Sequence, residues 1–200
     1  GTGSVGSSVL DVLRAYPERF RLTGVTGFNN LEKLSAIIKE FSPTHVGLGK
    51  ANPDFESAHP GVYFYNDREG FEEMTSLPDI DTVIIAISGI AGLRPTLSAI
   101  EAGKKILTAN KESIVSAGEI VNKRLDSHNN WLISLDSEHN AIFNQMIRMK
   151  REDVRDITLT ASGGPFRDKP IDDSVSLQDV LAHPTWDMGQ YITVNSATMM

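Results

Sequence analysis

The chain has 200 residues, which is enough for one or two domains with a sizeable hydrophobic core. It is 40% hydrophobic and 22% charged, as in ordinary globular proteins, and its net charge is −7. Because acidic and basic residues are interspersed, this charge argues against a general nucleic-acid or anionic-membrane surface. The sequence contains no cysteine, which excludes disulfides, thiolate metal ligands and a cysteine nucleophile. No apolar run reaches the roughly 18 residues of a membrane-spanning helix.

Short apolar segments alternate with amphipathic segments along most of the chain, and this pattern predicts alternating strands and helices. The predicted helices cover residues 7–16, 31–41, 69–77, 93–102, 113–126, 139–149 and 176–181. The predicted strands cover residues 20–25, 44–48, 61–65, 82–87, 105–108, 131–135 and 156–161. This order is typical of the α/β class, with a Rossmann-like, doubly wound parallel sheet. A change of pattern after Glu138 predicts a domain boundary near residues 136–150.

Several local signals refine these elements. Pro17 and Gly103 are expected to end the helices that precede them. Ser176 and Asp179 have the spacing of a capping box at the start of a short helix. The β-branched run at 82–87 predicts a strand that is buried on both faces, and the apolar run at 131–135 predicts another buried strand.

A glycine-rich loop, residues 1–6, precedes the first helix. Glycines at such a position let backbone N–H groups and the helix N-terminus approach a pyrophosphate, although similar loops also begin ordinary helices. The strand at 20–25 is followed by Gly27, Phe28 and Asn29, without the acidic residue that holds the ribose of NAD. This turn favours NADP over NAD, although it offers no Arg or Lys to bind the 2′-phosphate.

Polar residues follow two other predicted strands. Asp136 and Glu138 come directly after the strand at 131–135, and strand geometry would direct both carboxylates to one side. Converging carboxylates indicate a Mg²⁺- or Mn²⁺-type site, whereas a polar loop with Asp136 or Ser137 capping the next helix is the alternative. Lys111 follows the strand at 105–108, at the sheet edge where ligands bind, although a lysine there can also be simply solvated.

Seven segments together resemble the 1-deoxy-D-xylulose 5-phosphate reductoisomerase family. They are, in chain order, Thr-Gly-Ser-Val-Gly (2–6), Gly-Leu-Arg-Pro-Thr-Leu (92–97), Ala-Asn-Lys-Glu-Ser (109–113), Asp-Ser-Glu-His-Asn-Ala-Ile-Phe (136–143), Ser-Gly-Gly-Pro-Phe-Arg (162–167), His-Pro-Thr-Trp-Asp-Met-Gly (183–189) and Ser-Ala-Thr-Met-Met (196–200). Each segment is modest by itself, and their joint order along the whole chain makes the resemblance specific.

The resemblance implies a division of roles. Lys111, Asp136 and Glu138 would be catalytic, and the two carboxylates would be metal ligands for Mg²⁺, Mn²⁺ or Co²⁺. The implied substrate-binding residues are Ser137, Ser162, His183, Trp186 and Ser196. The implied NADPH-binding residues are Thr2, Gly3, Ser4, Val5, Gly27, Asn29, Asn110, Lys111 and Glu112.

The resemblance also implies an activity and a domain organisation. The expected reaction is the isomerisation and NADPH-dependent reduction of 1-deoxy-D-xylulose 5-phosphate to 2-C-methyl-D-erythritol 4-phosphate in non-mevalonate isoprenoid biosynthesis. Residues 1–136 would form the NADPH-binding domain, and residues 137–200 would begin an α+β catalytic domain. We expect a homodimer that is located in bacterial cytoplasm or in the plastid stroma. Its expected partner is a sugar-phosphate substrate, without a nucleic-acid or membrane partner.

Some features depart from the family pattern. Asn195 stands where Asp is usual, and Phe28 stands where some members have a basic residue. The first strand, a third carboxylate ligand and the C-terminal helical domain are expected to lie outside these 200 residues, which would leave the isolated polypeptide inactive and poorly folded. Two alternative functions remain, namely another two-domain NADP oxidoreductase of the semialdehyde or homoserine dehydrogenase type and a non-catalytic NADP-binding module.

Overall fold

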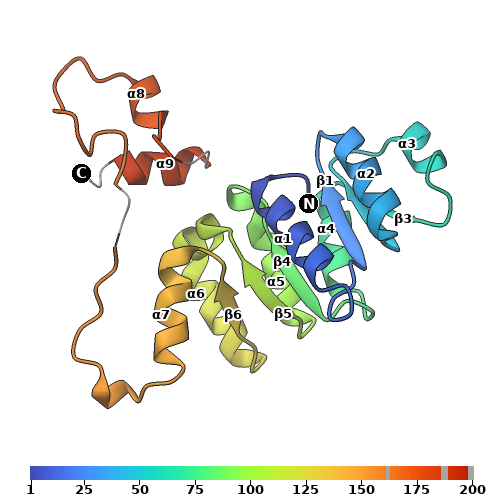
Figure 1. The fold of residues 1–200 in the computed structure, drawn as a ribbon, viewed down its shortest axis with the longest axis horizontal. Coiled ribbons are helices and arrows are strands. Elements are labelled where there is room, and N and C mark those ends of the chain that lie inside the picture. The colour runs from blue at the N-terminus through green and yellow to red at the C-terminus, as the bar shows by residue number, and fades with distance from the viewer. Residues whose placement is uncertain (161–162, 186–188, 198–200) are drawn as a thin grey trace.

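The structure, a computed structural model, describes residues 1–160, 163–185 and 189–197 (Figure 1). Its helices are α1 (Ser4–Ala15), α2 (Leu31–Phe41), α3 (Pro53–Ser57), α4 (Asp67–Ser76), α5 (Leu93–Glu101), α6 (Lys111–Ser127), α7 (Ser137–Met146), α8 (Leu177–Leu181) and α9 (Gln190–Ala197). Short 3₁₀ turns are η1 (Ile90–Gly92) and η2 (Arg151–Asp153). The strands are β1 (Gly24–Gly27), β2 (His45–Leu48), β3 (Tyr63–Asn66), β4 (Thr82–Ile85), β5 (Lys105–Thr108) and β6 (Leu132–Ser134).

The strands form two parallel, three-stranded sheets rather than one continuous sheet. Their orders are β1-β2-β3 and β4-β5-β6, and in the described part of the chain β1 does not pair with β4. All strand pairs are parallel, as expected for strands that are joined by crossover helices. The α/β class with parallel strands is therefore confirmed. Because the strands of each sheet are parallel, the turns after β4, β5 and β6 meet at one edge of their sheet.

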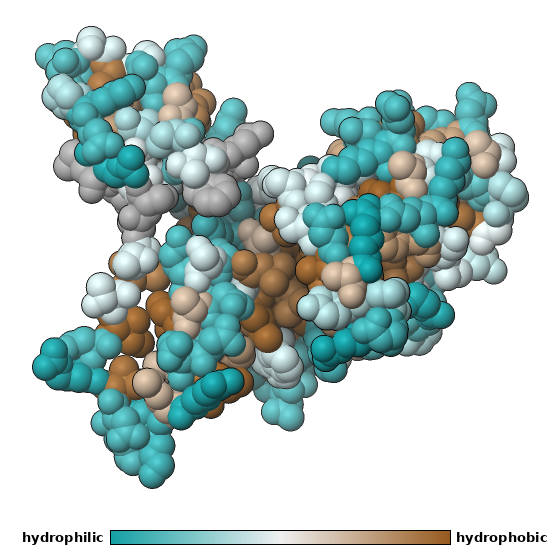
Figure 2. All heavy atoms as spheres, in the orientation of Figure 1, coloured by the Kyte–Doolittle hydropathy of each residue, from teal (hydrophilic) through white to brown (hydrophobic). Residues whose placement is uncertain are grey.

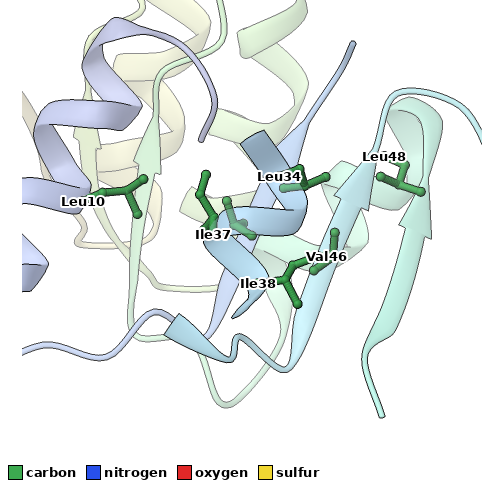
Figure 3. Close-up of a cluster of buried hydrophobic side chains, with 7 residues drawn as sticks. Leu10, Leu34, Ile37, Ile38, Val46 and Leu48 are labelled. Carbon is green, nitrogen blue, oxygen red and sulfur yellow. The ribbon is translucent and has the colours of Figure 1, made fainter. Parts of the chain in front are cut away.

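Each sheet has its own hydrophobic cluster. In the first cluster, residues from α1, α2, β1 and β2 pack together, and Leu34 and Val46 are completely buried (Figure 3). The buried residues of α2, namely Leu34, Ile37 and Ile38, have the three- and four-residue spacing of one helix face. The second cluster joins α5 and α6 to β4 and β5, and its members Ile100 and Ile106 are completely buried. These clusters fix the strand ends from which the candidate site residues extend.

The surface carries apolar side chains between these two halves of the molecule. Figure 2 shows hydrophobic surface in the recess between the half that contains α5 and α6 and the half that contains α2 and α3. Ile84 of β4 is 37% exposed, whereas its neighbours Val83 and Ile85 are buried. The prediction that 82–87 is buried on both faces was therefore wrong, because one face of β4 is uncovered.

Other sequence-based boundaries also needed correction. The predicted strand at 20–25 starts four residues later, at Gly24, and the strand at 131–135 shortens to β6, in which every residue is only half-buried. Residues 156–160 form no strand; they are exposed, and residue 161 lies outside the described residues. A period-2 pattern stabilises a strand only when a neighbour pairs with it, and no such neighbour occurs here among the described residues.

Two helices lie where the sequence predicted none. Helix α3 falls within the Asn-, Pro- and Gly-rich segment, where Asn52 caps it and Pro53 occupies its first turn. Helix α9 follows Gly189 and, with α8, lies apart from the sheets at the end of a long irregular segment (Figure 1). The capping box of Ser176 and Asp179 at α8 is confirmed. In the part of the chain that the structure describes, no helix is both long and apolar enough to cross a membrane.

Candidate functional site

The glycine loop leads directly into α1. Gly3 is the N-cap residue of α1, and as a glycine it has no side chain that could accept a hydrogen bond from the first turn of the helix. A Cβ added to Gly3 would meet no atom within 4 Å, so the space beside it is open. The N–H groups at the start of α1 therefore have no side-chain cap, and such groups can bind an anion.

The end of β1 lies against this loop. A Cβ on Gly27 would be 3.0 Å from Leu34 Cδ2 and 3.4 Å from Thr2 Cγ2, so a larger residue would separate β1 from α2 and the loop. Asn29 is exposed in the turn that follows, and Asn30 caps α2 by accepting the Lys33 N–H at 2.9 Å. Gly27 therefore lies beside the glycine loop, and Asn29 follows two residues later in the exposed turn.

Asn110 connects two of the strand-end turns. Its Nδ2 donates to the carbonyl oxygens of Ile87 and Gly89, each at 2.7 Å, in the turn after β4. Its Oδ1 accepts the N–H of Ser113 at 2.9 Å and so caps α6, which follows β5. The side chain is 2% exposed, because it lies between these turns. A Cβ on Gly92 would be 2.8 Å from Asn110 Cγ, so glycine is needed for this close approach.

Lys111 and Glu112 are the first two residues of α6. Lys111 is half-buried, and Glu112 is buried, with one carboxylate oxygen 3.3 Å from Asn110 Nδ2. The segment before α9 also reaches this point, because a Cβ on Gly189 would collide with Glu112 Oε1. Sequence reasoning missed Gly189, although it ends the His-Pro-Thr-Trp-Asp-Met-Gly segment.

Asp136 is the N-cap residue of α7. One of its oxygens accepts the His139 N–H at 2.8 Å and contacts His139 Nδ1 at 2.6 Å, while Ser134 donates to the other oxygen. Burial tends to raise the pKa of Asp136, and the hydrogen bonds from Ser134 and His139 outweigh it and hold that pKa below its usual value. The carboxyl group is therefore kept ionised, as both a helix cap and a metal ligand require.

Strand geometry does not continue through the acidic pair. β6 ends at Ser134 and α7 begins at Ser137, so Glu138 is already the second residue of a helix. The capping interpretation of Asp136 is correct, and the expected strand alternation of Asp136 and Glu138 does not occur. Each carboxylate oxygen has two lone pairs, so a capping Asp can still accept a further contact.

Ser137 and Glu138 line a shallow open cavity of about 190 Å³, whose other wall includes residues 158–160. Ser137 Oγ donates to Glu138 Oε2 at 3.0 Å. Among residues 1–160, 163–185 and 189–197, no three His, Cys, Asp or Glu side chains come together as a metal site. The two acidic residues offer only oxygen donors, which is the ligand type that Mg²⁺ and Mn²⁺ prefer.

The candidate phosphate-binding segments meet in the C-terminal part. A Cβ on Gly164 would collide with the carbonyl oxygen of Ser196 in α9, so the Gly163–Gly164 turn lies directly against that residue. Gly163 has a φ of +77°, which favours glycine. Ser162, immediately before this turn, lies outside the described residues.

His183 and Trp186 belong to the segment between α8 and α9. His183 is half-buried, and its Nδ1 accepts the Thr185 N–H at 3.1 Å. Trp186 lies outside the described residues.

Comparisons with known proteins match both parts of the chain to the same family. Residues 1–118 match the profile of 1-deoxy-D-xylulose 5-phosphate reductoisomerase, and residues 132–200 match that of its C-terminal domain. The chain belongs to the 1-deoxy-D-xylulose 5-phosphate reductoisomerase family. A reductoisomerase of Geobacillus sp. (strain WCH70) is 43% identical over 204 residues, and one of Chlorobium chlorochromatii is 44% identical over 207 residues. Each alignment covers 100% of this chain and 54% of the relative, so the chain spans about half the length of the relatives it matches.

Solved structures of the family share this fold. A reductoisomerase in complex with NADPH, fosmidomycin and magnesium aligns with a TM-score of 0.83 and 39% identity, over 98% of this chain and 52% of the other. The reductoisomerase of Zymomonas mobilis in complex with NADPH aligns with a TM-score of 0.80 and 33% identity, over 98% and 52%. The resemblance predicted from the sequence is therefore confirmed, and the semialdehyde or homoserine dehydrogenase alternative is not supported.

Proposed function

We propose that this chain provides the NADPH-binding part and the beginning of the metal- and substrate-binding part of a 1-deoxy-D-xylulose 5-phosphate reductoisomerase. The enzyme would convert 1-deoxy-D-xylulose 5-phosphate to 2-C-methyl-D-erythritol 4-phosphate by isomerisation followed by reduction, in non-mevalonate isoprenoid biosynthesis. The relatives that carry this name and the bound NADPH and magnesium of a related structure support the proposal.

One juxtaposition carries the proposal. β5 and β6 are neighbouring parallel strands, with Thr108 paired with Ser134, and Leu135 N–H donates to the Thr108 carbonyl at 2.7 Å. The segment from Asn110 to Glu112 follows β5, and the segment from Asp136 to Glu138 follows β6. The candidate cofactor residues and the candidate metal ligands therefore leave the sheet side by side, as a hydride transfer to a metal-bound substrate requires.

The two carboxylates fit a hard divalent cation, and we assign Asp136 and Glu138 as its ligands. Mg²⁺, Mn²⁺ or Co²⁺ bound there would act as a Lewis acid toward the substrate's carbonyl and hydroxyl oxygens. Ser134 and His139 hold the Asp136 carboxylate ionised and oriented, and Ser137 donates to Glu138. These contacts fix the oxygen donors before any substrate enters.

The nucleotide and substrate residues follow from the same arrangement. We assign the NADPH contacts to the loop residues Thr2, Gly3, Ser4 and Val5, to Gly27 and Asn29, and to Asn110, Lys111 and Glu112. Lys111 begins α6 between the cofactor residues and the acidic segment, where its ammonium would orient the substrate and stabilise negative charge on its oxygens.

Ser137, Ser162, His183, Trp186 and Ser196 are assigned to the substrate. Ser137 faces the cavity beside Glu138, so its hydroxyl would bind the substrate's hydroxyl groups. The close packing of Gly164 on Ser196 supports a phosphate subsite there, because backbone N–H groups of a Ser-Gly-Gly turn suit an anion. His183 and Trp186 would cover the substrate and exclude water from it.

The proposal also covers the domain division, the oligomeric state, the cellular location and the partners. We place the domain division between residues 136 and 137, and we expect a homodimer. The Geobacillus and Chlorobium relatives are bacterial, which supports a bacterial cytoplasmic location over the plastid stroma. A sugar phosphate is the expected partner, without nucleic acid or membrane.

The test is an assay of NADPH oxidation by the natural protein that carries this sequence, with 1-deoxy-D-xylulose 5-phosphate, in the presence and absence of EDTA. Asp136→Asn is the informative variant, because Asn caps helices about as well as Asp and removes only the charged ligand. Asp126→Asn, at an exposed position on α6, is the matched control.

Turnover that requires a divalent metal and falls by at least about a hundredfold in Asp136→Asn is expected, with little change in Asp126→Asn. Folded protein that binds NADPH without any turnover would instead favour a non-catalytic NADP-binding module. Turnover that EDTA and Asp136→Asn leave unchanged would contradict the metal assignment.

A further inference from the structure

The turn after β1 offers no charge to a nucleotide. It consists of Phe28, Asn29 and Asn30, and the Phe28 ring covers Gly49, since a Cβ there would lie 2.6 Å from Phe28 Cδ1. The ring also meets Phe71 edge-on, with the centroids 5.7 Å apart. This turn lacks the carboxylate that would select NAD, and it also lacks a cation that would bind the additional phosphate of NADP.

A cation reaches the same place from α2. Lys33, the third residue of α2, donates from Nζ to the Thr2 carbonyl oxygen at 3.0 Å and to Ser7 Oγ at 2.7 Å. The ammonium group therefore lies between the first turns of α1 and α2, beside the glycine loop. Both of its partners are uncharged.

This ammonium keeps an unneutralised charge. Among the described residues no carboxylate forms an ion pair with Lys33, and two of its three N–H groups are used by the bonds to Thr2 and Ser7. The side chain is half-buried, so bulk water screens its charge less than it screens an exposed lysine. A partly buried cation of this kind is stabilised when an anion binds next to it.

The position of Lys33 indicates which anion it meets. In a doubly wound fold the diphosphate lies at the N-terminus of the first helix, and the adenosine ribose lies at the end of the next strand, which is β1 here. Lys33 belongs to the helix that follows β1, two residues after the first residue of that helix. We propose that Lys33 supplies the positive charge that selects the 2′-phosphate of NADPH, an inference that rests on the proposed use of NADPH.

A purely structural role for Lys33 leads to a different expectation. If the side chain only ties α2 to the glycine loop, its loss weakens the binding of NADPH and NADH equally. Lys50 is a rival cation, because it is exposed two residues after the end of β2. Gly49 N–H donates to the Gly27 carbonyl at 3.2 Å, so the segment that carries Lys50 also runs beside the end of β1.

The experiment measures dissociation constants for NADPH and NADH by fluorescence titration of the natural protein that carries this sequence. Lys33→Met is expected to weaken NADPH binding about tenfold or more, because it removes a charge-assisted contact, and to change NADH binding less than about twofold. Lys33→Arg keeps the charge and is expected to restore most of the preference for NADPH.

Three control variants separate charge from structure. Ser7→Ala removes one partner of the Lys33 ammonium and leaves its charge in place, so the ratio of the two dissociation constants is expected to be unchanged. Lys39→Met removes the same charge from the last turn of α2, where the side chain is exposed, and serves as the matched control. Lys50→Met tests the rival cation.

The outcomes are distinct. Selective loss of NADPH affinity in Lys33→Met alone supports the proposal, and added salt is expected to diminish the loss. Equal weakening of both nucleotides in Lys33→Met, or a selective loss in Lys50→Met instead, overturns it. Wild-type protein that is folded but binds neither nucleotide contradicts the proposed function itself.

Discussion

Replacing Asn110 with alanine removes the side chain that joins two strand-end turns. The Asn110 amide donates to the carbonyl oxygens of Ile87 and Gly89, each at 2.7 Å, and its oxygen caps α6 through the Ser113 N–H. Alanine has no polar atoms to replace any of these bonds. The variant is therefore expected to lose stability even when no cofactor is present.

The magnitude follows from the separate bonds. Loss of an asparagine helix cap costs about 1 kcal/mol. Each carbonyl that loses its donor in this partly buried position costs about 1 kcal/mol more. The free energy of unfolding is therefore expected to fall by about 3 kcal/mol in Asn110→Ala, which is a large part of the stability of an ordinary domain.

Asn30→Ala is the matched control. Asn30 caps α2 with the same geometry, since its Oδ1 accepts the Lys33 N–H at 2.9 Å, and it is exposed. Its loss is expected to cost only the cap, about 1 kcal/mol. Urea unfolding followed by circular dichroism measures both variants, with the m-value checked for constancy. Equal losses in the two variants would refute the view that the Asn110 amide stabilises the turn after β4.

Three further predictions concern stability. Leu34→Ala, at a completely buried position, is expected to lower the free energy of unfolding by about 3 kcal/mol in urea, and a loss below about 1 kcal/mol would contradict the tight packing of α2. Gly47→Ala is expected to cost about 2 kcal/mol in the same assay, because its Cβ would lie 2.8 Å from Phe71 Cε1, and a neutral result would show that the ring moves freely. The hydrogen bond with His45 outweighs burial and lowers the pKa of Asp79 below its ordinary 3.8. The ionised Asp79 therefore contributes stability at pH values above 3.8, and this contribution is lost as the pH falls through the lower pKa of the folded state. Asp79→Asn is expected to flatten the decline of the unfolding midpoint below about pH 4, and an unchanged decline would refute the coupling.

The family and most of the elements around the nucleotide loop can be predicted from the sequence alone. Helix α2 begins and ends where the apolar spacing of Leu34, Ile37 and Ile38 predicted, and β5 has its predicted bounds. The Ser176–Asp179 capping box is also present as predicted. These features depend on neighbours within one or two turns of chain, so local periodicity and capping chemistry suffice to specify them.

The sequence placed the candidate residues after strands of a parallel sheet, but it did not predict the strand order or the contacts between the segments. Strand order brings the segment from Asn110 to Glu112 beside the one that starts at Asp136, and this adjacency follows from parallel topology. The bridging contacts of Asn110 to the turn after β4 join residues more than 20 positions apart, and no local pattern encodes them. Gly189 was missed for the same reason, because its proximity to Glu112 spans much of the chain.

In contrast, the positions of charged groups and the burial of strand faces depend on how distant segments of the chain fold together. In the sequence, Lys33 is indistinguishable from the other lysine of its amphipathic helix, and only the tertiary structure brings its ammonium to Thr2 and Ser7. Likewise, the apolar run at β4 predicted a strand that is buried on both faces. Burial depends on which elements pack against a strand, and the face of β4 that carries Ile84 is left uncovered. Local sequence sets backbone preference over a few residues, whereas burial and charge pairing are properties of residues that are distant in the chain.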